Sequence, residues 1–210
     1  MTESLDFIFK RRSIRKFTSE PISATDLKLL LEAAMAAPTA MNAQPWEFVV
    51  VTDLDVIRRM ADSLVFGKHH PAAVIAVCGS MRVTRNRAAS LFWVQDCSAA
   101  LQNILLAATA LDLGSVWVGV YPVRPFVRRI TRILNLPENV TPLGLVYLGH
   151  PAELKPARTQ YDESKVHWQT YEPQRPSAGN DLEVDAAASS VRRTAESTNL
   201  DAELLEEKKE

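Results

Sequence analysis

The sequence predicts an α+β fold in which one β-sheet is flanked by helices. Two observations support this prediction. Four short runs rich in valine and other apolar residues are expected to form strands, and they cover residues 47–52, 73–79, 115–121 and 142–149. Helical patterns occur between them without the strict strand–helix–strand alternation of a doubly wound fold, which favours α+β over a parallel α/β sheet.

Helices are predicted by apolar periodicity and by capping residues, and they cover residues 3–11, 24–37, 53–63, 93–113 and 124–134. Ser23 has the character of an N-cap, with Asp26 three residues later, and Pro38 ends the helix that follows. The stretch 64–71 is expected to be a loop, and 80–92 a loop or a partial helix.

The predicted helix at 93–113 is apolar nearly all round between Ser98 and Leu111, so it must be covered on several sides. In a chain of 210 residues, a second subunit is a reasonable source of that cover. Gly114 is expected to cap the end of this helix.

The last thirty residues differ from the rest of the chain. Residues 181–210 hold nine acidic and four basic residues and no aromatic residue. We expect a domain over 1–172 and a charged tail over 173–210 that is either disordered or an arm on a partner subunit.

Composition excludes several classes of function. The net charge is −1, which gives no reason to expect nucleic acid as a partner. The sequence contains no run of about 18 apolar residues, so no membrane span is expected. The N-terminus does not have the pattern of a signal peptide. Cys78 and Cys97 lie in apolar stretches outside any metal-binding spacing, so we expect buried thiols, no metal site and a cytoplasmic location.

A basic segment follows the first predicted helix and contains Arg11, Arg12, Ser13 and Arg15. Guanidinium groups offer a planar fork of donors that matches phosphate oxygens. The segment therefore suits an anion site, although a solvated basic helix end would explain it equally well.

Three further segments carry groups that suit a ligand. The loop at 38–46 offers a hydroxyl, two amides and small residues, but its polar side chains could serve the local backbone. Gly119, at the end of a predicted strand, would let a flat ring lie against the backbone, or it could allow a tight crossing of the chain. Residues 155–158 add cations after the last strand, where surface charges are also common.

The order and spacing of these pieces resemble the nitroreductase/flavin reductase family. The resemblance covers about residues 5–170 and rests on RRSIRKF, APTAMNAQPWEF, LGSVWVG and PLGLVYLGHPAELKPAR, in that order along the chain. It implies a three-layer α/β/α sandwich with a mainly antiparallel sheet, and a homodimer with shared FMN sites.

The resemblance also implies which residues bind FMN. The family's basic N-terminal segment holds the FMN phosphate and ribityl chain and reaches the ring; here it is Arg11, Arg12, Ser13 and Arg15. The family's amide-bearing loop borders the flavin, often from the other subunit; here it is Pro38, Thr39, Ala40, Met41, Asn42 and Gln44.

The remaining implied contacts lie after the third strand and near the end of the domain. Val118, Gly119 and Val120 correspond to the stretch that faces the flavin ring, and Arg158 to a second phosphate cation. No catalytic side chain is implied, because the flavin carries the chemistry.

The expected activity is transfer of hydride or electrons from NAD(P)H through bound FMN to an electron-poor small molecule such as a nitroaromatic or a quinone, in ping-pong turnover. The lack of a GxGxxG motif agrees with transient rather than tight binding of NAD(P)H. Two alternatives stay open: a specialised flavin reaction such as ene reduction, dehalogenation or flavin fragmentation, and a non-catalytic flavin-binding or electron-transfer module.

His69 and His70 are not expected to form a metal or acid–base site, because no carboxylate lies near them in sequence. Phe66 is a candidate for lining the acceptor pocket.

Overall fold

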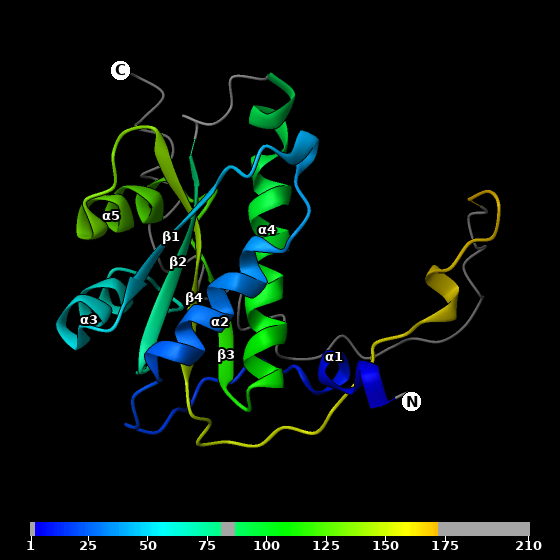
Figure 1. The fold of residues 1–210 in the computed structure, drawn as a ribbon, viewed down its shortest axis with the longest axis horizontal. Helices are drawn as coiled ribbons and strands as arrows, with labels where there is room; N and C mark the ends of the chain where they lie inside the picture. The colour runs from blue at the N-terminus through cyan, green and yellow to red at the C-terminus, as the bar shows by residue number, and fades with distance from the viewer. Residues whose placement is uncertain (1–2, 81–86, 172–210) are drawn as a thin grey trace, which may run out of the picture. The chain divides into compact units, whose positions relative to one another are not determined.

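The computed structural model describes residues 3–80 and 87–171, and its centre is a four-stranded antiparallel sheet. The strands are β1 (Trp46–Val51), β2 (Ala73–Ser80), β3 (Gly114–Gly119) and β4 (Val140–Gly149), in the spatial order β1-β2-β4-β3 (Figure 1). Every neighbouring pair is antiparallel, and β3 lies at one edge of this sheet. All four predicted strands are confirmed.

The helices also follow the sequence prediction closely. They are η1 (Glu3–Leu5), α1 (Asp6–Lys10), α2 (Ala24–Met35), η2 (Ala40–Asn42), α3 (Leu54–Asp62), α4 (Arg87–Ala110), α5 (Arg124–Leu134) and η3 (Glu163–Lys165). The Ser23 hydroxyl accepts a hydrogen bond from the Asp26 amide at 3.0 Å, so the predicted cap of α2 is confirmed. The helix α4 takes in the last part of the segment 80–92, whose residues 81–86 lie outside the described residues.

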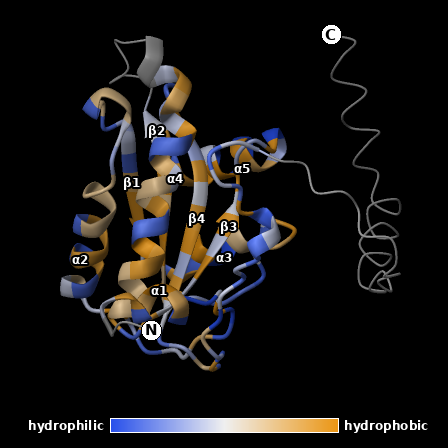
Figure 2. Cartoon of the chain, turned by 90° about the vertical axis from the view of Figure 1, so that its right-hand side faces the viewer, coloured by the Kyte–Doolittle hydropathy of each residue, from blue (hydrophilic) through white to orange (hydrophobic). Residues whose placement is uncertain are grey.

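Each face of the sheet is covered by a pair of helices, because strand residues alternate between two apolar cores. In β2, Ala73, Ile75 and Val77 belong to the core under α2 and α4, whereas Val74 and Ala76 belong to the core under α3 and α5. Figure 1 shows the two helix layers on opposite sides of the sheet, and Figure 2 shows the strands hydrophobic along most of their length. The predicted α+β class and three-layer α/β/α arrangement are confirmed.

The turn between α4 and β3 differs from the prediction for Gly114. The left-handed residue after the helix is Asp112, with φ 55°, and the Leu113 amide donates back to the Ala108 carbonyl at 2.8 Å. Gly114 instead begins β3. A β-carbon there would lie 2.8 Å from a methyl carbon of Ile14, so the glycine is required by a close approach of the N-terminal segment and not by a helix cap.

That N-terminal segment runs along the outer edge of β3. The Ile14 amide donates to the Ser115 carbonyl at 2.9 Å, and Ser13 forms a parallel bridge with Ser115. Farther along, Phe17 bridges to Pro151, directly after β4. The basic segment is thereby held against the edge of the sheet.

Residues 161–171 form a separate short unit, which starts after Gln160. The Asp162 carboxylate accepts hydrogen bonds from the amide and hydroxyl of Ser164 at 3.1 Å and 2.6 Å, and this caps η3. The rings of His167 and Tyr171 lie 4.2 Å apart. The proposed tail at 173–210 lies outside the described residues, so the division into 1–172 and 173–210 stays a prediction.

Two negative findings concern the described residues. Among residues 3–80 and 87–171, no helix is long and apolar enough to cross a membrane. Within the same ranges, no group of three or more His, Cys, Asp or Glu residues could hold a metal ion. The prediction that Cys78 and Cys97 are buried free thiols is confirmed, and burial raises the pKa of each thiol to about 12.

Candidate functional site

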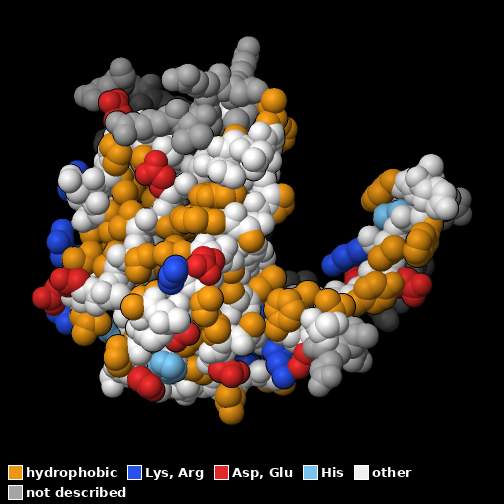
Figure 3. Space-filling view, viewed as in Figure 1, with side chains coloured by type: hydrophobic (Ala, Val, Ile, Leu, Met, Phe, Trp, Pro, Cys, Tyr) orange, Lys and Arg blue, Asp and Glu red, His pale blue; other side chains and the backbone are white. Residues whose placement is uncertain are grey.

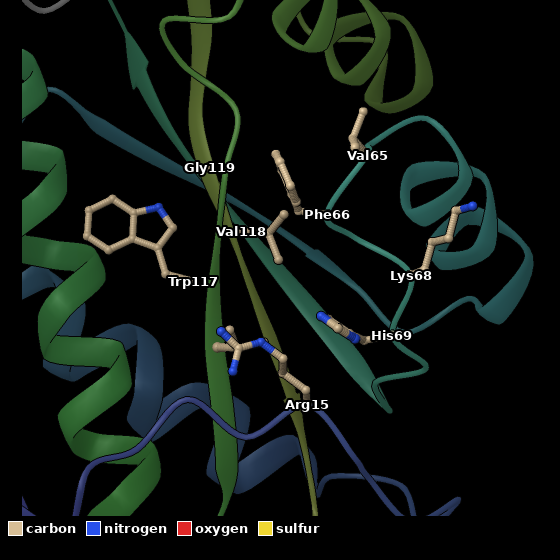
Figure 4. Close-up of a pocket in the computed structure, with 9 residues that line it drawn as sticks. Arg15, Val65, Phe66, Lys68, His69, Trp117, Val118 and Gly119 are labelled. Carbon is tan, nitrogen blue, oxygen red and sulfur yellow. The ribbon is translucent and has the colours of Figure 1, made fainter. Parts of the chain in front are cut away.

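A cavity of about 480 Å³ lies at the edge formed by β3. Its lining comes from three parts of the chain: Arg15 of the basic segment, residues Val65, Phe66, Lys68 and His69 of the loop after α3, and residues Val116, Trp117, Val118 and Gly119 of β3 (Figure 4). A cavity of this size falls within the range of about 300–1,000 Å³ that is usual for small-molecule sites.

The strand β3 presents bare backbone to this cavity at its last residue. Gly119 is exposed, and a β-carbon placed on it would meet no atom within 4 Å. Val118 is nearly buried, and Val120 is fully buried in the core under α3 and α5. Of the three residues expected to face a ring, Val118 and Gly119 therefore line the cavity, and Val120 packs behind it.

The basic segment is held in place by two side chains that follow β4. The Arg15 amide donates to a carboxylate oxygen of Glu153 at 2.7 Å, and the Lys155 ammonium donates to the Ser13 carbonyl at 2.6 Å. Glu153 and Lys155 also form an ion pair at 3.1 Å. The Arg15 amide is the main cause that holds the pKa of Glu153 below its ordinary value, with Lys155 second.

Lys155 thus serves the backbone of the basic segment rather than acting as a free cation. The role of Arg158 as a phosphate cation stays a prediction, and the Arg158 amide donates to the Phe9 carbonyl at 3.1 Å. This bond places the backbone of Arg158 beside the end of α1, close in sequence to Arg11.

The four arginines near this edge differ in their availability to an anion. The Arg12 guanidinium donates to the Pro156 carbonyl. The guanidinium groups of Arg11, Arg15 and Arg158 make no hydrogen bond or ion pair with any residue in the part of the chain that the structure describes. Of these residues only Arg15 lines the cavity; Arg11, Arg12, Ser13 and Arg158 are not among its lining residues.

The predicted amide-bearing loop, at 38–44, does not line this cavity. Its backbone is unusual, because Met41, Asn42 and Gln44 all have φ near 50°, which costs about 1–3 kcal/mol at each such residue. The Thr39 hydroxyl accepts from the Gln44 amide at 3.1 Å.

A buried carboxylate on α4 also holds this loop. Asp96, 6% exposed, accepts from the Ala40 amide at 3.0 Å through one oxygen. The other oxygen has no hydrogen-bond partner among the described residues. The side chains of Met41, Asn42 and Gln44 are exposed. Strain of this kind persists where the surroundings over-determine it, which is a common property of binding loops.

The loop after α3 supplies residues that the sequence did not single out for this site. Phe66 lines the cavity, as the sequence suggested, and is 77% exposed. Lys68 and His69 also line it, whereas His70 is exposed outside it. The sequence carries no signal for His69, because only the fold brings the loop after α3 beside β3.

The surroundings of His69 change its acid–base behaviour. Burial, followed by the charge of Arg15, lowers the pKa of its imidazole below the ordinary value of 6.5. Its ring stands edge-on to the ring of Tyr147, with the centroids 6.3 Å apart and an interplanar angle of 85°.

A second cavity, of about 530 Å³, lies near the start of α2 and is lined by residues such as Ile22, Leu27 and Leu54. None of its lining residues is charged. The cavity at β3 is therefore the better candidate for an anionic ligand, although it is slightly smaller.

Comparison with known families supplies the observation that identifies the chain. The family model described as "Nitroreductase family" matches residues 8–67 and 63–150. The chain belongs to the nitroreductase family. The matched residues include the basic segment, the amide-bearing loop, the loop after α3 and β3, so every residue that lines the cavity lies within the nitroreductase match.

Individual relatives agree with this assignment. A curated protein of Archaeoglobus fulgidus, "Putative NADH dehydrogenase/NAD(P)H nitroreductase", is 40% identical over 172 residues, which are 80% of this chain and 98% of that protein. A crystal structure of the same description from Bacteroides thetaiotaomicron has a TM-score of 0.75 at 38% identity and covers 81% of this chain and 99% of its own. An FMN-dependent nitroreductase from Clostridium difficile has a TM-score of 0.72 at 26% identity and covers 80% of this chain and 99% of its own. The resemblance inferred from the sequence is confirmed.

Proposed function

We propose that the protein is an NAD(P)H-dependent oxidoreductase that binds FMN in the cavity at β3 and reduces electron-poor small molecules. The observation that carries this proposal is that Arg15 and Gly119, whose backbone has no atom near the position of a β-carbon, line the same cavity. Similarity to an FMN-dependent nitroreductase and to a protein named for NAD(P)H supports the choice of cofactor and of electron donor.

The residues of the site fit FMN. The phosphate is a dianion, and Arg11, Arg15 and Arg158 offer guanidinium groups without competing protein partners among the described residues. The flat ring system needs an unobstructed surface, and Gly119 leaves such a surface because no atom lies near the position of a β-carbon. Phe66 and Trp117 add apolar surface on either side of that strand.

Bound FMN supplies the redox chemistry, because it accepts two electrons from NAD(P)H and passes them to the acceptor. The task of the chain is to hold the reactants and to set the charge around them. Glu153 and Lys155 fix the backbone from Ser13 to Arg15, so that the Arg15 guanidinium stays at the cavity. We propose ping-pong turnover, in which NAD(P)+ leaves before a nitroaromatic, a quinone or a similar acceptor enters the same cavity.

We further propose a homodimer in which the amide-bearing loop of one subunit borders the flavin of the other. The loop 38–44 is exposed and outside the cavity of its own chain, which leaves it available to a second copy. The helix α4 keeps apolar side chains on the surface, with Leu91 67% and Phe92 46% exposed. Figure 3 shows hydrophobic side chains spread over the face where α2 and α4 lie. Burial of such a surface would stabilise a dimer by removing apolar area from water.

The buried thiols suit the reducing cytoplasm, which we propose as the location of the protein.

The function can be tested on the purified protein. It should be yellow, release FMN on denaturation and elute as a dimer, and anaerobic addition of NADH or NADPH should bleach the flavin absorbance. Reoxidation by a quinone or a nitroaromatic should then restore the colour. A colourless protein that cannot be loaded with FMN would refute the proposal. Flavin that is bound but bleached by neither nicotinamide would favour a non-catalytic flavin module.

A further inference from the structure

We propose that His69 is a catalytic residue that delivers a proton to the acceptor during its reduction. This inference rests on the proposed function. It begins from the balance of the reaction, in which NAD(P)H, one proton and the acceptor give NAD(P)+ and an acceptor that carries two added hydrogens. NAD(P)H supplies two electrons and one proton, so each turnover needs one further proton from water.

The cavity contains one side chain suited to transferring that proton near neutral pH. The titratable lining residues are Arg15, Lys68 and His69. Arginine and lysine ordinarily release protons only far above neutral pH, whereas histidine exchanges its proton between about pH 5 and pH 8. Geometry also separates them: in Figure 4 the imidazole of His69 is directed toward β3 and the Arg15 guanidinium, and the Lys68 side chain points away from both.

The orientation of His69 is set by its surroundings. The hydrogen bond from its amide to the Gly67 carbonyl, at 2.7 Å, closes a tight turn directly before His69, and the next residue, His70, is exposed and does not line the cavity. The ring of Tyr147, on β4, lies edge-on behind the imidazole. Tyr147 cannot replace His69 as a proton source, because burial raises the pKa of its hydroxyl to about 12.

Charged groups around His69 explain how proton uptake would follow electron uptake. Arg15, from the N-terminal segment, and His70, on the same loop, lower the pKa of His69, while Glu153, after β4, raises it. Burial is the largest cause, and the net effect is a lowered pKa, which favours the neutral imidazole. Two electrons entering the cavity bring negative charge, which favours the imidazolium form, so His69 takes up a proton from water at that stage.

The transfer step is then balanced. The N–H bond of the imidazolium breaks, and its proton forms an O–H bond on the still deprotonated oxygen of a quinone that has received two electrons and one proton from the reduced cofactor. The imidazole is left neutral, as at the start. The products are the hydroquinone and the oxidised cofactor, and no further oxidant or reductant is required.

The matched variants are His69→Gln, which keeps a polar side chain that cannot titrate, and His70→Gln, which changes the exposed neighbour. Wild type and both variants are loaded with FMN, reduced anaerobically by NADPH or NADH, and mixed with a quinone between about pH 5 and pH 8. Proton uptake on reduction is measured separately with an indicator dye in weak buffer, which reports on His69 without any turnover.

In the wild type and in His70→Gln, we expect reoxidation by the quinone to slow as the pH rises. In His69→Gln this dependence should vanish, and the rate should fall by about 10²-fold, because a positioned general acid contributes about 10²–10⁴-fold. FMN retention and bleaching by NAD(P)H should be unchanged, and reduction should take up less than the wild-type amount of protons.

A structural role for His69 is tested by adding free imidazole to His69→Gln. Imidazole exchanges its proton in the same pH range as the lost side chain, so it should partly restore the reoxidation rate and its pH dependence, a result that a packing role would not produce. If His69→Gln keeps the wild-type pH dependence and proton uptake while wild type binds FMN and is bleached, the inference about His69 is wrong and the proposed function stands. Failure of the wild type to bind FMN or to bleach would overturn both.

Discussion

Replacing Gly119 with alanine should stabilise the FMN-free protein and weaken FMN binding. The added β-carbon meets no atom within 4 Å, and the φ of Gly119 lies outside the left-handed region, so the folded chain accepts alanine without strain. Alanine restricts the unfolded chain more than glycine does, which is worth about 0.4–1 kcal/mol. For a domain of this size, the unfolding midpoint should rise by about 1–4 °C.

The effect on FMN has the opposite sign. A ring lying on the strand would be displaced by the new methyl group, and overpacking of this kind typically costs about 1–3 kcal/mol. FMN affinity should therefore fall by about 5- to 150-fold. The unfolding midpoint is measured by circular dichroism on FMN-free protein, and affinity by titrating the quenching of FMN fluorescence.

Gly144 provides a matched control, because it pairs directly with Gly119 across β3 and β4. A β-carbon on Gly144 would lie 2.5 Å from Nε1 of Trp117 and 3.2 Å from the Val118 carbonyl, so Gly144→Ala should lower the unfolding midpoint. Unchanged FMN affinity in Gly119→Ala, together with the expected gain in stability, would show that the ring does not lie against Gly119 and would refute the proposed placement.

Two further predictions concern the phosphate end of the site. Arg11→Ala combined with Arg158→Ala should weaken FMN retention by about 10²-fold or more, because each charge-assisted hydrogen bond is worth about 1.5–3 kcal/mol. Equilibrium dialysis measures the retention. Arg132→Ala on α5 serves as a control that should leave FMN retention unchanged. Lys155→Met should weaken FMN binding by about 5-fold, because the Ser13 carbonyl loses its donor in a partly exposed setting, and Lys155→Arg should restore it. Equal affinities for Lys155→Met and wild type would mean that Lys155 does not position the basic segment.

Local structure could be read from the sequence because its causes are local. Ser23 and Asp26 begin α2 through their own hydrogen bonds, and the valine-rich runs become strands since both faces of the sheet are buried. Gly114 shows the limit of such reasoning. Its position after a helix suggested a cap, but the residue is small because Ile14, a hundred residues earlier in the chain, lies against it.

The candidate site likewise contains residues that the sequence predicts and residues that only the structure reveals. The sequence singled out Arg15 and Gly119 because their residue types suit a phosphate and a flat ring, and the structure brings both to one cavity. It did not single out Lys68 and His69 for that cavity, because only the fold brings the loop after α3 beside β3. Lys155 was expected among surface cations, and only the fold shows that its ammonium group binds the Ser13 carbonyl.

The sequence by itself determined the elements, the layered α+β class and the family, since periodicity, caps and short motifs are written in neighbouring residues. Tertiary structure alone decided how the distant ends of the domain meet. The contacts of Glu153 with the Arg15 amide and of Arg158 with the Phe9 carbonyl join residues that are far apart in the chain. They depend on β3 and β4 pairing at one edge of the sheet, which places the chain that follows β4 beside the basic segment that runs along β3.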